Sequence, residues 1–269
     1  MKREEDIHRD EAAFHDRWAE STDPDQLLIK ESFEAITAQE NRFILDLLGD
    51  VRGKRILDIG SGLGESALYF ASLGAQVVAT DISEKMLELC RQNAAAMGLE
   101  INTVVSSAEN LNVKDDSFDI VYAANALHHV PDRNRMLQNA RSALKPGGCF
   151  VAWDPLKYNP IIGVYRRLAS DVRTHDESPL GFDDLKTTRK YFRNVGHREF
   201  GLATLLIFIK YYIIDRKDPS STRYWKEVLK ETGDTIGWWY RPLLGIDNLI
   251  LRVPIVRAMA WNMVQWGYK

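Results

Sequence analysis

Two hydrophobic periods alternate along the chain between about residues 54 and 154. Short apolar runs typical of buried strands read KRILDI, QVVATD, INTVVS, FDIVYAA and CFVAWD. Apolar residues at helical spacing occupy the stretches between them, GESALYFASLG, SEKMLELCRQNAAAMG and DRNRMLQNARSAL. Strands that alternate with helices predict right-handed crossovers and a mainly parallel sheet covered on both faces. The expected fold class is a doubly wound α/β domain, whose ligands bind at the carboxyl ends of the strands.

The composition argues against several classes of partner. The chain has 269 residues, 45% of them hydrophobic, and a formal net charge of −3, so nucleic acid is not an expected partner. Its two cysteines, Cys90 and Cys149, lack the spacing of metal ligands, and no metal site is expected. The charged N-terminus is unlike a signal peptide, and the longest apolar stretch, 202–209, is shorter than the ~20 residues of a spanning helix. We therefore expect a cytoplasmic protein.

A glycine-rich turn follows the first predicted strand. Gly60, Gly62 and Gly64 lack Cβ atoms, which lets a ligand approach the backbone and the amides at the start of the next helix. Asp81 ends the second strand, at about the ~20-residue spacing at which nucleotide-binding folds place a carboxylate for ribose hydroxyls. Together the two features predict a cofactor site, whereas each alone could be a tight turn or a solvated strand end.

The type of cofactor follows from departures from the dinucleotide pattern. A pyrophosphate site has the spacing G-x-G-x-x-G, but here the spacing is G-x-G-x-G and Glu65 replaces the third glycine. Asp58 places a second carboxylate beside the turn, where it would repel a diphosphate and attract a cation. A positively charged cofactor is therefore expected, and an NAD-dependent oxidoreductase is the weaker alternative.

Four ordered stretches resemble the motifs of class I S-adenosylmethionine-dependent methyltransferases: LDIGSGLGES, VVATDIS, SSAENLNVKDDSFDIVYAANALHHVPD and LKPGG, within about residues 51–155. The resemblance implies a seven-stranded Rossmann-like sheet in which strand seven runs antiparallel between strands five and six. It also implies cofactor contacts from Gly60, Ser61, Gly62 and Gly64 around the methionine part, Asp58 at its amino group, Asp81 on the ribose, Ile82 and Met86 on the adenine, and Asn125 facing the sulfonium. Ser107 replaces an aspartate of many relatives that binds the adenine amino group, so Ala108 and Glu109 are expected to supply that contact.

The resemblance implies methyl transfer, which needs mainly an acceptor atom in line with the methyl group. His128 and His129 are candidate general bases for a hydroxyl acceptor, although at least one of them could be structural. The expected function is transfer of a methyl group from S-adenosylmethionine to a small hydrophobic or lipid-like acceptor, by O-, N- or C-methylation. A non-catalytic scaffold that binds S-adenosylmethionine is the alternative.

Three regions are expected. Residues 1–45 carry apolar residues at helical spacing and predict lid helices over the cofactor, so that removal of residues 1–40 would leave a soluble fold with weaker cofactor binding. Residues 46–155 form the cofactor-binding core. Residues 156–269 recognise the acceptor and contain strands six and seven, predicted at 195–205 and 258–268. The candidate acceptor contacts after strand five are Asp154, Tyr158, Arg166, Arg173 and His175.

A long insertion, about 206–257, separates the last two predicted strands. It contains short apolar stretches and the pair Trp238 and Trp239, and residues 201–269 carry ten Lys and Arg against six Asp and Glu. Such a segment is typical of interfacial helices or of a hydrophobic cap, which would mean peripheral contact with a membrane and a lipid-, polyketide-, terpenoid- or quinone-like acceptor. The alternative is that its apolar faces complete the core or a homo-oligomer interface.

Overall fold

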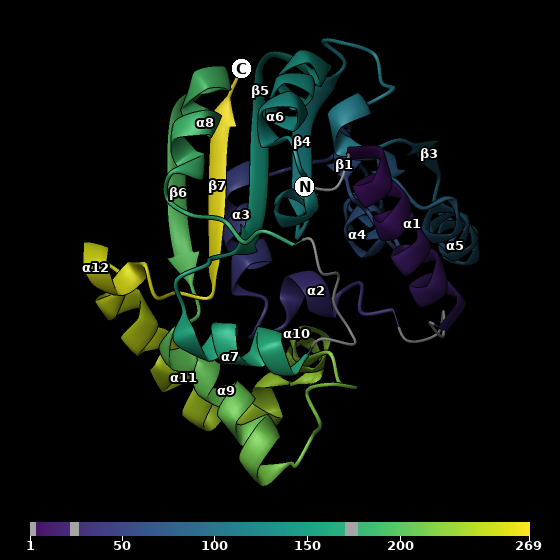
Figure 1. Cartoon of the computed structure of the whole chain (residues 1–269). Helices are drawn as coiled ribbons and strands as arrows, with labels where there is room; N and C mark the ends of the chain where they lie inside the picture. Colours follow the sequence, from purple (N-terminus) through teal and green to yellow (C-terminus); the bar gives the residue numbers. More distant parts are fainter. Residues whose placement is uncertain (1–3, 22–26, 170–176) are drawn as a thin grey trace.

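The described residues form one mixed sheet of seven strands in the order β3-β2-β1-β4-β5-β7-β6 (Figure 1). The structure is a computed structural model that describes residues 4–21, 27–169 and 177–269. The strands are β1 Arg55–Ile59, β2 Gln76–Asp81, β3 Ile101–Val105, β4 Phe118–Ala124, β5 Leu144–Pro155, β6 Arg193–Phe200 and β7 Asn262–Tyr268. The expected α/β fold is confirmed.

The pairing of the strands places a crevice at one edge of the sheet. β1 lies between β2 and β4 and is parallel to both, so the order of the strands reverses at β1. β7 runs antiparallel to β5 and to β6, as predicted. Because ligands bind where the order reverses, at the carboxyl ends of β1 and β4, this edge is where a site is expected.

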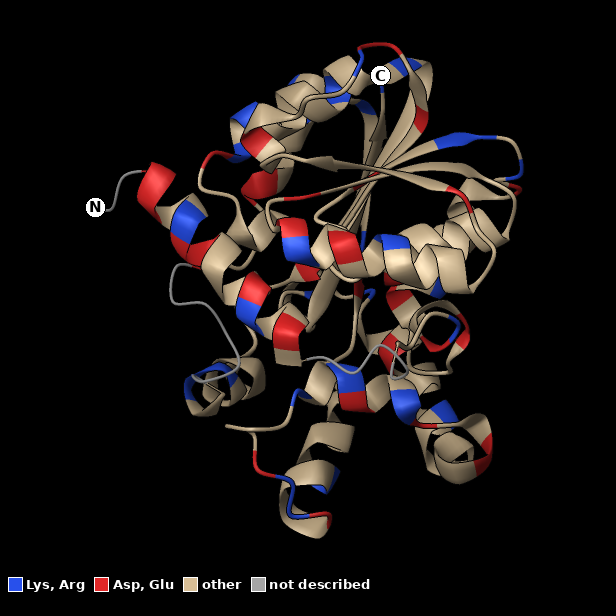
Figure 2. Ribbon diagram, turned by 90° about the vertical axis from the view of Figure 1, so that its right-hand side faces the viewer, with Lys and Arg blue, Asp and Glu red and all other residues tan. Residues whose placement is uncertain are grey.

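Helices cover both faces of the sheet, and each face has its own apolar core. One core contains buried residues of α2 Glu31–Glu34, α3 Gln39–Leu48, α4 Glu65–Ser72 and α5 Glu84–Ala96, and the other contains those of α6 Arg133–Ala143 and α8 Asp184–Tyr191. Charged residues lie mainly on the helices and at the strand ends, and the middle of the sheet is largely free of them (Figure 2). Side-chain caps start two of the helices: Ser83 accepts a hydrogen bond from the Met86 amide, and Asp132 accepts one from the Arg135 amide.

Apolar residues at helical spacing run through 32–49 in the sequence and indicate one helix there, but the structure interrupts it. α2 ends at Glu34 and α3 begins at Gln39, because Ala35 is extended and the Thr37 hydroxyl donates to the carbonyl of Val228, 2.7 Å away. Phe33 and Ile44 are fully buried in the main core. α1, Glu4–Ser21, lies over the cavity described below, and Glu40 and Asn41 of α3 also border that cavity.

Helices after β5 and β6 form a layer below the carboxyl ends of the strands (Figure 1). We call this the helical layer; it comprises α7 Pro160–Leu168, η5 Ala203–Leu205, α9 Leu206–Ile209, η6 Lys210–Ile214, α10 Tyr224–Glu227, η7 Val228–Lys230, α11 Gly233–Ile250 and α12 Pro254–Arg257. A third apolar core, with Tyr165, Phe208 and Tyr240, holds it together. The predicted insertion is thus helical, although it is longer than 206–257.

Both ends of the insertion differ from the sequence prediction. β6 ends at Phe200, and residues 203–205 form a 3-10 turn whose amides donate to the buried carboxylate of Asp247 in α11. β7 begins at Asn262, whereas position 258 caps α12. β5 begins at Leu144 and includes the PGG segment that was expected to precede it. Among the described residues, no helix combines the length and the apolar character needed to cross a membrane.

Candidate active site

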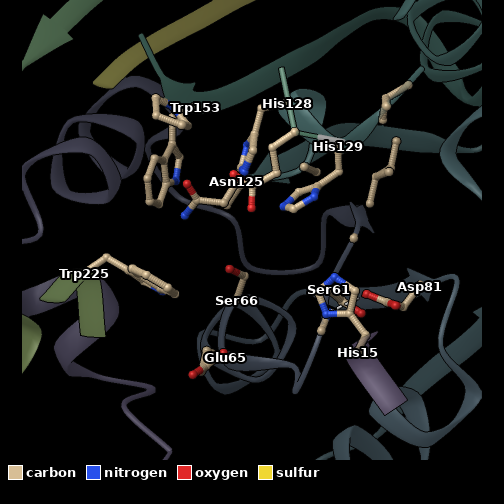
Figure 3. A pocket seen from close by; sticks show the side chains of 18 of the residues that line it. His15, Ser61, Glu65, Ser66, Asp81, Asn125, His128, His129, Trp153 and Trp225 are labelled. Atoms are coloured by element: carbon tan, nitrogen blue, oxygen red, sulfur yellow. Dashed lines mark hydrogen bonds between the residues drawn. The ribbon is translucent and has the colours of Figure 1, made fainter. Parts of the chain in front are cut away.

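A cavity of about 340 Å³ lies at the carboxyl ends of the parallel strands, enclosed by α1 and the helical layer (Figure 3). Residues from the ends of β1, β2, β4 and β5 form one side of its wall. Trp153 and Trp225 stand at one end of the close-up and Asp81 at the other, with Asn125 and two histidines between them. The cavity therefore has a polar end near the glycine turn and an aromatic end near the helical layer.

The glycine turn after β1 forms part of the wall. Gly60 and Gly62 border the cavity with φ angles of 71° and 53°, in the left-handed region that favours glycine. Ser61, between them, also faces the cavity. Gly64 lies behind this wall, with φ 92°, where an added Cβ would stand 2.3 Å from Cys90 Sγ. Three of the four predicted residues thus reach the cavity, and the fourth shapes the turn.

Two carboxylates border this end of the cavity. Asp81 accepts hydrogen bonds from the Gly62 amide at 2.8 Å and the Ser83 amide at 2.9 Å, which fixes its orientation at the end of β2. Asp58 is almost fully buried, and its Oδ2 has no hydrogen-bond partner among the described residues. Burial, together with the charge of Asp81, raises the pKa of Asp58 to about 8. A buried carboxylate without a partner on a cavity wall suits a cationic group.

Side chains from β2, α5 and the loop after β3 surround the far part of the polar end: Ile82, Met86, Ser107, Ala108 and Glu109. Met86 borders the cavity and also packs against Leu63 and Ala19 in a small apolar cluster. It is therefore both a wall residue of the cavity and a core residue. Glu109 is buried, and its carboxylate lies 3.2 Å from His8 Nε2. The carboxylate of Glu109, which is predicted to bind the adenine, thus also pairs with a side chain of α1.

α1 closes the cavity on the side opposite the sheet. It contributes six residues to the wall: Ile7, His8, Glu11, Phe14, His15 and Trp18. Glu11 binds His129 Nδ1 at 2.8 Å and His15 Nε2 at 3.0 Å, and these partners hold its pKa well below the usual range against the effect of burial. The helical periodicity of the sequence indicated the helix, but no local signal identified Glu11, His8 or His15.

Asn125 and the two histidines follow β4. Asn125 has a φ of 51°, and its amide donates to the Trp153 carbonyl at 2.8 Å. His128 and His129 lie in the short helix η3, Leu127–His129, and both border the cavity. Asp154 Oδ1 lies 2.8 Å from His128 Nδ1 and accepts from the His128 amide at 3.1 Å.

The candidate acceptor residues fall in different places. Asp154 is fully buried behind His128 and does not border the cavity, which corrects its predicted contact with the acceptor; burial raises its pKa to about 7. Tyr158 is also away from the cavity, stacked on Phe182. Arg166 does border the cavity, with Nη2 3.0 Å from Glu177 Oε2. Arg173 and His175 lie outside the described residues.

Several residues of the aromatic end were not identified from the sequence. They are Trp153 on β5, Tyr165 on α7, Glu177, Trp225 on α10 and Trp261. Trp153 Nε1 donates to Asn41 Oδ1 at 2.9 Å, which fixes the indole beside the cavity. These residues lie far apart in the sequence and meet only in the folded chain. No local pattern therefore marked them as site residues.

Comparisons with known proteins agree with this geometry. The family model described as a methyltransferase domain matches residues 57–152. The ubiquinone/menaquinone biosynthesis C-methyltransferase UbiE of Haemophilus ducreyi is 31% identical over 179 residues, which cover 56% of this chain and 68% of that protein. The ubiquinone biosynthesis O-methyltransferase of Bordetella avium is 32% identical over 127 residues, which cover 47% of this chain and 52% of that protein.

Solved structures show the same fold. A methyltransferase of Thermotoga maritima aligns with a TM-score of 0.59 and 18% identity over 96% of this chain and 99% of that chain. A phosphoethanolamine N-methyltransferase of Haemonchus contortus, solved with S-adenosylhomocysteine, aligns with a TM-score of 0.63 and 16% identity over 96% of this chain and 59% of that chain.

The residues of the polar end fit the cofactor that these methyltransferases share. The turn bordered by Gly60 and Gly62 leaves space that side chains would fill, Asp58 offers a buried carboxylate to an amino cation, and Asp81 ends β2 where a ribose carboxylate is expected. Glu65 starts α4 and replaces the third glycine of a dinucleotide site. This chain belongs to the class I S-adenosylmethionine-dependent methyltransferases.

Proposed function

We propose that this methyltransferase acts on a hydrophobic, hydroquinone-like acceptor whose ring hydroxyl loses its proton during methyl transfer. The observation that carries the proposal is the aromatic end of the cavity, which is bordered by Trp153, Tyr165, Trp225 and Trp261. Flat aromatic walls favour a planar ring by stacking and by burial of apolar surface. The names of the two relatives, which concern ubiquinone and menaquinone biosynthesis, support an acceptor of this class.

The cofactor supplies a methyl group on a positively charged sulfonium when it is bound. We expect Asp58 to bind its amino group and Asp81 its ribose hydroxyls, because these carboxylates border the polar end of the cavity. Asn125 lies between the polar and aromatic ends, where it can hold the reacting groups in line (Figure 3). α1 covers this region, which limits its contact with bulk water.

The acceptor must lose a proton, and the polar cluster beside the aromatic walls provides for this. An acceptor oxygen, or the ring carbon next to it, forms a bond with the methyl carbon while the methyl–sulfur bond breaks and its electron pair stays on sulfur. The hydroxyl proton leaves through the groups that border this part of the cavity, His128, His129 and Glu177. Methylation at either position starts from a phenolate, which activates both its oxygen and its ring carbons. When a ring carbon is methylated, that carbon then loses its own hydrogen as a proton, and the oxygen takes up a proton to restore the hydroxyl.

A methylation assay with radiolabelled cofactor tests the proposal. Short-chain quinols and catechols are compared with polar acceptors such as histamine and phosphoethanolamine, and mass spectrometry and NMR locate the methyl group. We expect labelled product from the aromatic acceptors only, and a higher acceptor KM for Trp225→Ala with unchanged binding of S-adenosylhomocysteine. Turnover of polar acceptors alone would contradict the proposal. Binding of S-adenosylhomocysteine without transfer to any acceptor would favour a scaffold, and binding of NAD in its place would overturn both.

A further inference from the structure

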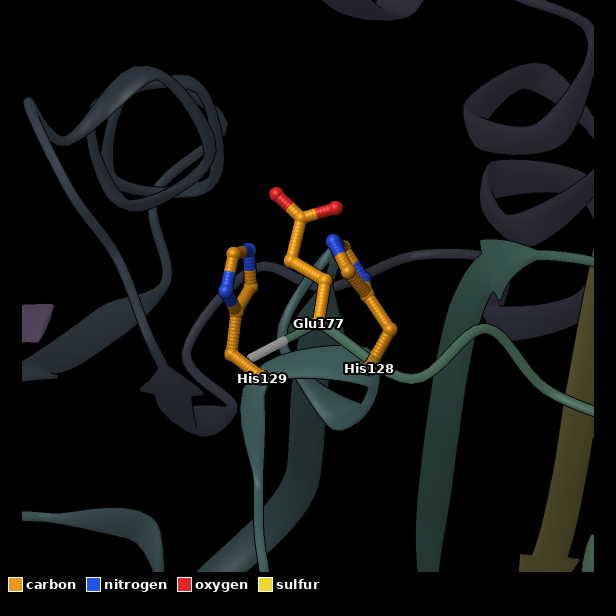
Figure 4. Close-up of side chains that lie close together, drawn as sticks. All are labelled: His128, His129 and Glu177. Atoms are coloured by element: carbon orange, nitrogen blue, oxygen red, sulfur yellow. The ribbon is translucent and has the colours of Figure 1, made fainter. Parts of the chain in front are cut away.

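We propose that His128, His129 and Glu177 together bind one divalent transition-metal ion at the wall of the cavity. One ligand atom from each of these side chains lies within 4.8 Å of the other two. The side chain of Glu177 lies between those of His128 and His129 (Figure 4). Two imidazoles and one carboxylate are a common ligand set for zinc and for non-haem iron.

The ligand atoms lie further apart than in an occupied metal site. Zinc binds nitrogen and oxygen ligands at about 2.0–2.2 Å in tetrahedral geometry, so two ligands of one ion are about 3.3–3.6 Å apart. The three ligand atoms here lie within 4.8 Å of one another, so the side chains must approach by up to about 1.5 Å when an ion binds.

Each candidate ligand is held by a second charged side chain. Asp154 Oδ1 lies 2.8 Å from His128 Nδ1, and Glu11 Oε1 lies 2.8 Å from His129 Nδ1. Asp154 Oδ1 already accepts from the His128 amide, and an ionised Glu11 carboxylate only accepts, so Nδ1 of each ring carries the hydrogen and Nε2 is the nitrogen that can bind a metal. Carboxylates on the far nitrogen of metal-binding histidines are the usual outer partners in metalloproteins.

Glu177 has an outer partner as well. Arg166 Nη2 lies 3.0 Å from Glu177 Oε2 and orients the carboxylate. The side chains of His128 and Glu177 are each only 6% exposed, so a bound ion would be shielded from bulk water. His129 is 22% exposed and leaves the ion open toward the cavity. Three protein ligands with an open position are the arrangement of catalytic metal sites.

The role of the ion in catalysis rests on the proposed function. A hydroxyl of the acceptor that binds the open position of the ion loses its proton more readily, because the positive charge stabilises the oxygen anion. The O–H bond breaks with its electron pair on the oxygen, the proton leaves to water on the open, cavity side of the ion, and the oxygen anion is ready for methyl transfer. His128 and His129 then act as ligands, in place of the general bases predicted from the sequence.

Titration with Co²⁺ tests the site without any methylation assay. The full-length protein is freed of metal with a chelator, and visible absorption of Co²⁺ is followed to saturation. We expect one Co²⁺ per chain, displacement by Zn²⁺, and at least tenfold weaker binding in Glu177→Gln and in His129→Asn. His197→Asn is the matched control, because His197 also pairs with a carboxylate, that of Glu199, but lies on β6 and does not border the cavity. Thermal unfolding and binding of S-adenosylhomocysteine verify that each variant is folded.

The possible results are distinguishable. The metal site is overturned if Co²⁺ does not bind stoichiometrically, or if both variants bind it as tightly as the control does. If Co²⁺ binds as expected but the metal-free protein still methylates quinols at the full rate, the catalytic role is disproved and the metal site stands. Failure to methylate quinols, with Co²⁺ bound as expected, would contradict the proposed function and leave the metal site standing.

Discussion

Asp58 is placed to bind the ligand at a cost to the stability of the ligand-free fold. Its carboxylate is almost fully buried, Oδ2 has no hydrogen-bond partner among the described residues, and Asp81 adds a second negative charge. Burial and the charge of Asp81 therefore disfavour the ionised form of Asp58 in the folded, ligand-free protein. A cationic amino group at this place would remove the imbalance, so the chain gains stability when the cofactor binds.

We predict that Asp58 makes the ligand-free protein less stable as pH rises. Its pKa is raised from 3.8 to about 8 in the folded state, so its contribution to stability is complete below pH 3.8 and is lost as pH rises through 8. Urea unfolding at pH 6 and pH 9 measures this loss, which Asp58→Asn should remove. The same variant should bind S-adenosylhomocysteine about 10- to 100-fold more weakly, since a charged hydrogen bond contributes roughly 1.5–3 kcal/mol.

The exposed carboxylate of Glu100 provides the control for this prediction. Glu100→Gln should change neither the pH dependence of unfolding nor the affinity for S-adenosylhomocysteine, because this side chain is exposed on the loop before β3. Equal stability of the wild type and Asp58→Asn at both pH values would show that Asp58 does not titrate as described.

Alanine substitutions at Gly64 and at Gly98 distinguish two destabilising effects, backbone strain and steric clash. Both have positive φ, 92° and 66°, but a Cβ on Gly64 would stand 2.3 Å from Cys90 Sγ, whereas a Cβ on Gly98 meets nothing within 4 Å. Gly98→Ala should therefore lower the free energy of unfolding by about 1–2 kcal/mol through the left-handed backbone alone. Gly64→Ala should lower it further and also weaken cofactor binding, because the turn must shift. Chemical unfolding and calorimetry measure both effects, and equal losses in the two variants would contradict the prediction.

Among the elements, α1 packs on α5 and covers one side of the site. Asp16 accepts a hydrogen bond from Ser83 Oγ at 2.6 Å, Trp18 lies under the guanidinium of Arg223, and Ala19 is the one fully buried residue assigned to this helix. By contrast, α3 belongs to the core, where Asn41 Oδ1 accepts hydrogen bonds from Tyr122 and Trp153. Removal of residues 1–40 would also delete Phe33 of α2, which is fully buried in the main core, so we expect that truncation to destabilise the fold.

We predict that deletion of residues 1–21 leaves a cooperatively folded protein with impaired cofactor binding. Six wall residues and the contacts to Ser83 and His129 are lost with α1, so affinity for S-adenosylhomocysteine should fall by roughly 10- to 100-fold, the effect of about 1.4–2.8 kcal/mol. Phe33→Ala in α2 is the contrasting variant. It should lower the free energy of unfolding by about 3–5 kcal/mol through a cavity in the core. Unchanged affinity after the deletion would exclude a lid role for α1.

The elements that the sequence predicted well are those defined by local patterns. The strands β1 to β5 and the cap at Ser83 depend on residues close to one another in the chain, so periodicity and residue type were sufficient. The break between α2 and α3 depends on a hydrogen bond from Thr37 to Val228, which no local pattern encodes. For the same reason Gly60 and Asp81 were found as site residues, whereas Glu11 and Glu177, which meet the histidines through tertiary structure, were not.

On the scale of the whole molecule, the helical layer connects the cavity to an apolar outer surface. Trp225 on α10 borders the cavity, while Trp238 and Leu249 on α11 are 81% and 66% exposed. Trp238, Arg241 and Leu249 follow the helical repeat, so apolar side chains and a basic one share one exposed face of α11. A helix with this face is suited to the surface of a membrane that carries anionic lipids. We propose that the layer contacts such a membrane and receives the hydrophobic acceptor from it.

Vesicle co-sedimentation tests this last proposal. The protein should pellet with anionic vesicles more than with neutral ones, and less at high salt, because the basic residues of the layer contribute. The double variant Trp238→Glu with Leu249→Glu should lose binding and methylate a long-chain quinol in vesicles slowly, yet turn over a soluble short-chain quinol normally. Leu73→Glu with Met97→Glu, which alters exposed apolar residues outside the layer, is the matched control. A wild-type protein that stays in the supernatant with both kinds of vesicle would exclude membrane contact, and the acceptor would then have to reach the aromatic end of the cavity from solution.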